Sequence, residues 1–130
     1  MIVIDASAAV ELLLWTERGQ RVAEHIADPA ATVHAPHLLA IEVAQVIRRL
    51  EHAGEVSARR AVGALEDLAA LVVNRYEHEL LLPRIWQLRK NVSGYDAAYV
   101  ALAELLEAPL LTFDEKLANT PGNGATFLIP

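Results

Sequence analysis

Near its start the chain reads Ile2-Val3-Ile4-Asp5-Ala6-Ser7-Ala8-Ala9. The three β-branched residues predict a short strand, and the alanines that follow Asp5 favour a helix that continues to about Leu14. A strand that passes directly into a helix is the first half of a strand-helix-strand unit. This stretch therefore predicts an α/β fold.

The rest of the chain repeats the alternation. Apolar or β-branched runs predict further strands at 32–35, 71–76 and 110–113 and near 126–129, and helical patterns cover about 20–27, 37–53, 58–70, 79–90 and 95–106, with a short helix from 115. Pro36, Gly54 and the Pro121-Gly122-Asn123-Gly124 turn separate some of these segments, and Ser57 is a plausible N-cap. Strands that alternate with helices imply a mainly parallel sheet covered on both faces.

Size and composition limit the class of protein. The 130 residues are 54% hydrophobic, which predicts a single domain over residues 1–130 with one core. The net charge of -6 argues against a general nucleic-acid coat protein, which needs clustered cations, but a nuclease site built from carboxylates is compatible with it. With no cysteine, the chain has neither a disulfide framework nor a thiolate metal site.

The first residues of the sequence do not resemble a targeting signal. The apolar run at the start is stopped by Asp5 and has no basic residues before it, unlike a signal peptide. No uncharged apolar stretch approaches the roughly 20 residues that cross a bilayer. We expect an intracellular, cytoplasmic protein without a membrane partner.

Three aspartates lie where a strand or loop passes into a helix. Asp5 and Asp114 follow predicted strands directly, and Asp96 is the last residue of a Ser93-x-x-Asp96 pattern. Each one, taken singly, is explained better as a helix cap: Asp5 and Asp114 as N-caps and Asp96 as part of a capping box.

Their shared position changes this interpretation. Ligands of open parallel sheets bind outside the carboxyl ends of the strands, so Asp5 and Asp114 would face one crevice if their strands are neighbours. Several carboxylates in one crevice repel one another unless a cation lies between them. Oxygen-only ligands suit Mg²⁺, with Mn²⁺ as a substitute, whereas His34 and His37 offer no spacing typical of zinc.

Three further residues are candidates for the same site. Glu42 borders the apolar ridge of its predicted helix, where it is explained equally well as a boundary residue paired with Arg49 or solvent. Ser7 and Thr112 each lie two residues from a candidate aspartate, so their hydroxyls could orient a carboxylate or cap a helix.

Four segments in this order resemble the PIN-domain family, and most closely the VapC-type toxins of toxin-antitoxin pairs. They are Val3-Ile4-Asp5-Ala6-Ser7-Ala8, Ile41-Glu42-Val43-Ala44, Tyr95-Asp96-Ala97-Ala98-Tyr99-Val100-Ala101-Leu102-Ala103-Glu104 and Pro109-Leu110-Leu111-Thr112-Phe113-Asp114. The resemblance covers essentially the whole chain. It implies a three-layer α/β/α sandwich with a central, mainly parallel sheet.

The resemblance also implies a function. It assigns catalytic and metal-site roles individually to Asp5, Glu42, Asp96 and Asp114, all of which are present. The implied activity is Mg²⁺-dependent endoribonuclease activity, in which one or two ions orient a water and stabilise charge on the scissile phosphate. The implied partners are an RNA substrate, a cognate antitoxin and a second copy of the chain in a homodimer.

Several questions stay open at this stage. Arg48, Arg49, Arg89 and Lys90 are the cations that we assign to RNA, although pairing with neighbouring glutamates is an equally ordinary role for an exposed arginine. An RNA-processing or structure-specific nuclease and a non-catalytic binding module remain alternatives. A phosphatase of the paired-aspartate kind is disfavoured, because Ser7 stands two residues after Asp5 where a second aspartate would be needed.

Overall fold

The computed structural model describes all residues from Met1 to Pro130. Its centre is one five-stranded sheet in the order β3-β2-β1-β4-β5, and every neighbouring pair is parallel. The strands are β1 (Ile2–Ile4), β2 (Val33–Pro36), β3 (Asn74–Tyr76), β4 (Leu110–Leu111) and β5 (Phe127–Leu128). The predicted parallel sheet is confirmed.

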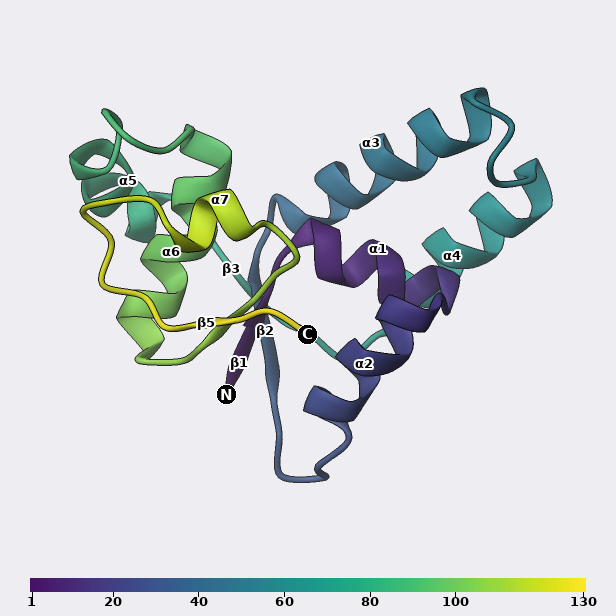
Figure 1. Cartoon of the computed structure of the whole chain (residues 1–130), viewed down its shortest axis with the longest axis horizontal. Coiled ribbons are helices and arrows are strands. Elements are labelled where there is room, and N and C mark those ends of the chain that lie inside the picture. The colour runs from purple at the N-terminus through teal and green to yellow at the C-terminus, as the bar shows by residue number, and fades with distance from the viewer.

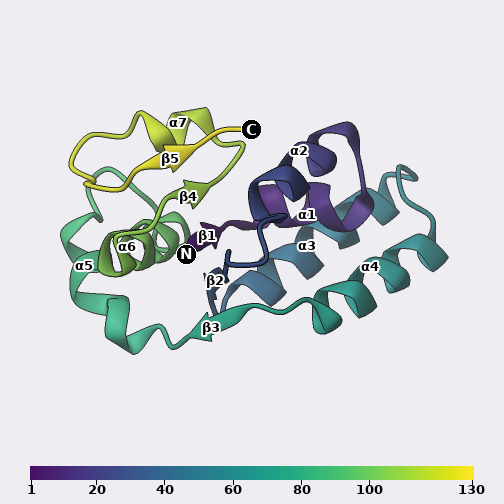
Figure 2. The same ribbon diagram turned by 90° about the horizontal axis from the view of Figure 1, so that it is seen from below.

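Helices cover both faces of this sheet (Figures 1 and 2). On one side lie α1 (Ala6–Leu14), α2 (Glu17–Ile26), α3 (Leu39–His52) and α4 (Ala58–Ala70), and on the other the 3₁₀ helix η1 (Glu79–Leu81), α5 (Leu82–Gln87), α6 (Gly94–Leu106) and the short α7 (Glu115–Ala118). The predicted three-layer α/β/α sandwich is therefore confirmed. No helix is both long and apolar enough to span a bilayer.

The direction in which the sheet grows reverses at β1. From β1 the chain builds β2 and then β3 on one side, and it returns through α5 and α6 to add β4 and β5 on the other. A parallel sheet has its natural binding crevice at such a reversal, because the loops that leave the two neighbouring strands diverge there. In this fold the reversal lies between the carboxyl ends of β1 and β4, so we expect the binding site there.

The helix α6 forms the centre of the core on its side. Its residues 97–103 are all buried, and the helix packs against β1, β2 and β4. Four of these seven residues are alanines, which let the helix backbone approach the sheet closely. Asp96 immediately precedes the buried run, so the packing of α6 fixes where that residue lies.

Some predicted boundaries were wrong by a few residues. The strand predicted at 71–76 forms only at Asn74–Tyr76, and the predicted helix at 79–90 is the 3₁₀ helix followed by the short α5. Pro36 is the last residue of β2, and the helix predicted from about residue 37 begins at Leu39. The ends of elements depend on long-range pairing, here of Pro36 with Tyr76, which a local pattern does not contain.

Candidate active site

Two of the four predicted acids meet at the reversal of the sheet. β1 pairs with β4, with Ile4 beside Leu111, so Asp5 and Asp114 leave neighbouring strands at the same edge. The backbone N–H of Asp5 donates to the carbonyl of Leu111 at 3.3 Å. The two strands are therefore neighbours, which is the condition on which the shared position of these aspartates depended, and Figure 1 shows α1 and α7 starting at this end of the sheet.

Asp5 is held by three donors. Its Oδ1 accepts hydrogen bonds from the Ser7 hydroxyl at 2.6 Å and from the backbone N–H of Ala8 at 3.0 Å, and its Oδ2 accepts one from the hydroxyl of Thr112. Asp5 is also 93% buried, since only 7% of its surface is exposed. These bonds fix the carboxylate in one orientation.

Thr112 joins Asp5 to Asp114. Its hydroxyl is fully buried, donates to Asp5 and accepts the backbone N–H of Asp114 at 2.9 Å. The Ser7 oxygen accepts the backbone N–H of Phe113 at 3.0 Å, which ties the loop after β4 to the start of α1 a second time. The two hydroxyls that we singled out from the sequence thus connect the two strand-end aspartates.

The capping roles and the site roles of the aspartates coexist. Asp5 caps α1, and Oδ1 of Asp114 caps α7 by accepting from Leu117 at 3.0 Å. The N–H of Asp96 donates to the Ser93 hydroxyl at 3.2 Å, as in half of a capping box, and the Ser93 side chain lowers the pKa of Asp96 in part. Capping does not exclude a second function for these side chains, because a carboxylate has about four acceptor sites.

The acids also influence one another's charge. Burial and then the charges of Asp114 and Asp5 raise the pKa of Asp96. Burial raises the pKa of Asp5, although its hydrogen bonds lower it in part. A cluster in which neighbouring carboxylates raise one another's pKa stores repulsion that a bound cation would relieve.

Glu42 joins this cluster from the first turn of α3. Burial raises the pKa of Glu42, the Tyr99 hydroxyl lowers it in part, and the charges of Asp96 and Asp5 raise it further. Oε1 of Glu42 and the Tyr99 hydroxyl are both buried, and neither makes a hydrogen bond of good geometry. The alternative pairing of Glu42 with Arg49 is absent, since the ion pairs in the structure are Arg18–Glu11 and Arg84–Glu104.

The donor set suits a hard cation held partly through water. No three acidic or histidine side chains lie close enough together to coordinate one ion directly. Mg²⁺ commonly binds proteins through one or two carboxylates and keeps several of its waters, so a looser group of oxygens is compatible with it. The unpartnered Oε1 of Glu42 is a free acceptor for such a water.

The four cations that we assigned to RNA do not lie together. Arg49 lines a hollow that includes Glu42, whereas Arg48 lines another beside Ala58. The Arg89 guanidinium lies 4.5 Å from the centre of the Trp86 ring and donates to the Trp86 carbonyl, and Lys90 is exposed. Arg49 is therefore the one that the fold places beside the acids.

Some residues near the acids were missed by sequence reasoning. Tyr99 lies in one of the segments that carry the family resemblance, but no role in the site was assigned to it from the sequence. Arg18 lies 4.0 Å from the centre of the Phe113 ring, next to Asp114, through a contact between α2 and the β4 loop that no local pattern signals. The exposed ring of Tyr95 precedes Asp96 directly, and exposure next to a candidate acid was a signal that the sequence could not supply.

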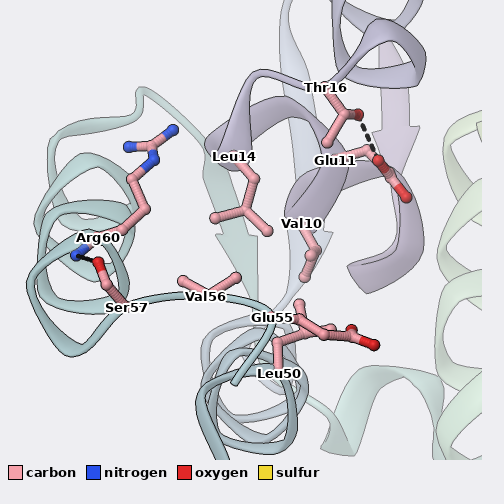
Figure 3. A pocket seen from close by; sticks show the side chains of 9 residues that line it. All are labelled: Val10, Glu11, Leu14, Thr16, Leu50, Glu55, Val56, Ser57 and Arg60. Carbon is pink, nitrogen blue, oxygen red and sulfur yellow. Dashed lines mark hydrogen bonds between the residues drawn. The ribbon is translucent and has the colours of Figure 1, made fainter. Parts of the chain in front are cut away.

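A second, larger hollow of about 500 Å³ lies away from these acids (Figure 3). Its apolar side chains come from α1, α3 and the loop before α4, and charged side chains of Glu11, Glu55 and Arg60 surround them. None of the four acids lines it, so it is separate from the candidate active site.

The chain is similar to known proteins over most of its length. The family model described as PIN domain matches residues 2–123. Ribonuclease VapC1 of Mycobacterium tuberculosis strain H37Rv is 43% identical over 121 residues, which cover 92% of this chain and 90% of that protein. Ribonuclease VapC12 of the same strain is 40% identical over 125 residues, covering 96% and 95%.

One similar solved structure is that of Mycobacterium tuberculosis VapC20, described as a sarcin-ricin loop cleaving toxin. It superposes with a TM-score of 0.68 at 18% sequence identity and covers 91% of this chain and 93% of that one. The structure of VapBC2 from Rickettsia felis bound to a DNA fragment from their promoter gives a TM-score of 0.65 at 12% identity, covering 99% and 98%. At these identities the superpositions show the shared fold.

Proposed function

Because the chain belongs to the PIN-domain family, as a VapC-type member, we propose that it is a metal-dependent endoribonuclease and the toxin of a toxin-antitoxin pair. The proposal is supported by two observations: Asp5 and Asp114 leave neighbouring strands and are joined through Thr112, and the acids act on one another's charge. The charges of Asp114 and Asp5 raise the pKa of Asp96, and those of Asp96 and Asp5 raise the pKa of Glu42. The names of the relatives support RNA as the substrate and an antitoxin as the partner. Such a protein would act in the cytoplasm.

The residues that would hold Mg²⁺, or Mn²⁺ in its place, are Asp5, Asp96 and Asp114, with Glu42 beside them. When bound, the cation lowers the pKa of a water and stabilises negative charge on the scissile phosphate. The protein supplies rigid positioning: Ser7 and Thr112 fix the Asp5 carboxylate, and the same Thr112 hydroxyl anchors the loop that carries Asp114.

Glu42 has a different task from the three aspartates. Its Oε1 is buried and makes no hydrogen bond of good geometry within the protein, so it is available to accept one from the attacking water. Its raised pKa strengthens it as a proton acceptor. We assign Glu42 to the positioning of that water and to the acceptance of its proton.

A homodimer is part of the proposal. Leu80, Leu82 and Trp86 lie on η1 and α5 with 61%, 52% and 66% of their surface exposed. A cluster of large exposed apolar side chains on neighbouring turns is typical of a protein interface. Sedimentation equilibrium over a range of concentrations measures this directly, and a monomer at all of them would contradict it.

Growth on expression separates a toxin from a nuclease with a housekeeping role. We expect the wild-type protein to arrest growth, Asp96→Asn to permit it, and a small protein encoded beside the toxin to relieve the arrest. Unimpeded growth with active nuclease present would favour the alternative of an RNA-processing enzyme. Absence of any nuclease activity would favour a binding module.

A further inference from the structure

A hollow of about 390 Å³ lies beside the acids and has no assigned role. Its wall includes Glu42 itself, Ala6, which follows Asp5, and Tyr95, which precedes Asp96. Its volume falls in the range of about 300 to 1,000 Å³ that small-ligand pockets occupy. The hollow is thus continuous with the candidate active site and large enough to bind part of its substrate.

Several of the side chains that line it lack partners within the protein. The Tyr95 ring is 67% exposed and Ile41 is 73% exposed, so an aromatic and an aliphatic surface both face solvent there. Arg49 takes part in none of the ion pairs, and neither its side chain nor those of Gln45 and Tyr95 are in any hydrogen bond of the structure. Ile41, Gln45 and Arg49 recur at intervals of four residues, which places them along one face of α3.

We propose that this hollow binds one unpaired nucleotide of the RNA, next to the phosphate that is cut, and that Tyr95 stacks on its base. The proposal rests on the proposed function and names the form of substrate that the site accepts. Unpaired bases can turn out of a strand and stack on aromatic rings, whereas bases within a duplex cannot. Ile41 gives an apolar contact, the Gln45 amide offers a donor and an acceptor to the base edge, and Arg49 binds a phosphate.

A protein face would fit the same hollow less well. Covering it with a second copy of the chain would bury the Arg49 cation and the Gln45 amide, which is costly without partners. A nucleotide supplies a partner for each of them. The chemistry of the lining therefore favours a nucleotide over a second copy of the chain.

The test compares steady-state cleavage of one RNA sequence in unpaired and base-paired form by the wild type, Tyr95→Ala, Tyr95→Phe and Trp15→Ala. Trp15 is a matched control, because it is an exposed aromatic residue that lines neither this hollow nor the acids. We expect Tyr95→Ala to lower kcat/KM for unpaired RNA about 5- to 150-fold, mainly through KM, the range for loss of one base stack. Tyr95→Phe and Trp15→Ala should stay within about 2-fold of the wild type, since a stack requires only the ring.

Four results would be informative in different ways. The proposed nucleotide site is wrong, while the proposed ribonuclease activity is unaffected, in either of two cases. In the first, Tyr95→Ala cleaves unpaired RNA as well as the wild type does. In the second, its kcat/KM falls by the same factor on paired and unpaired RNA. If the wild type cleaves no RNA, the proposed function itself fails. If Tyr95→Ala converts a dimer to a monomer in sedimentation equilibrium, a second copy occupies the hollow and the proposal is overturned. Loss on unpaired RNA alone, with the oligomeric state unchanged, supports it.

Discussion

The hydroxyl of Thr112 should contribute measurably to stability, and Thr112→Val tests this. Valine keeps the shape of the side chain but removes the oxygen that donates to the Asp5 carboxylate and accepts the N–H of Asp114. A hydrogen bond to a charged group contributes about 1.5 to 3 kcal/mol and a neutral one about 1 kcal/mol, so the free energy of unfolding should fall by about 3 kcal/mol. The site is fully buried, and water cannot replace either bond.

The matched control is Thr112→Ser, which keeps the hydroxyl and removes one methyl group. We expect it to lose only about 1 kcal/mol, the value for one buried methyl group. Urea unfolding followed by circular dichroism, at pH 7 with EDTA, gives both free energies. If Thr112→Val is no less stable than Thr112→Ser, the hydroxyl does not hold Asp5 and Asp114 together, and the account of how the site is positioned fails.

Three other predictions concern charge. Burial and neighbouring charges raise the pKa of Asp96 in the folded state. The folded chain therefore keeps a proton that the unfolded chain releases, and the stability of the fold decreases as pH rises above about 4. Asp96→Asn should raise the Tm in EDTA at pH 7 to 8, and this gain should vanish near pH 4. His34 forms hydrogen bonds with Tyr76 and Thr32 at 2.7 Å each, and burial, followed by the charge of the amino terminus, lowers its pKa. The folded protein should therefore lose stability as pH falls below about 6.5. Thermal unfolding of His34→Gln over the same pH series should not show this loss. Tyr99→Phe removes the hydroxyl that lowers the pKa of Glu42, so the acidic limb of the pH profile of RNA cleavage should move to higher pH.

One result would contradict each of these three predictions. An unchanged or lower Tm of Asp96→Asn at pH 8 would mean that the acids do not repel one another. A wild type and a His34→Gln variant with parallel pH dependence would remove His34 as the cause. An unshifted profile in Tyr99→Phe would mean that its hydroxyl does not act on Glu42.

Local sequence predicted the elements well because their signals are local. The β-branched run before Asp5, the cap at Ser57 and the alanine-rich stretch of α6 each specify an element within a few residues. The short β3 and the broken helix after Glu79 were predicted less accurately, since pairing with β2 and packing of the turns on α6 decide their lengths.

The acidic residues of the candidate site could be named from the sequence, but the contacts that join them could not. Asp5 and Asp114 could be named from their position after strands, yet only the folded sheet makes β1 and β4 neighbours. The bond from Thr112 to Asp5 joins residues 107 positions apart, and the approach of Tyr99 to Glu42 depends on how α6 packs near α3. The hollow at Tyr95 depends on the same packing, which sequence spacing alone does not reveal.

Whether these acids form a ribonuclease active site is decided by cleavage of a mixed pool of cellular RNA. The purified protein, free of antitoxin, is compared with Asp96→Asn in Mg²⁺ and in EDTA. We expect defined fragments with the wild type in Mg²⁺, and none in EDTA or with the folded Asp96→Asn variant. Equal cleavage by wild type and Asp96→Asn, or no cleavage by the wild type in Mg²⁺ or Mn²⁺, would contradict the assignment of these acids as a ribonuclease active site.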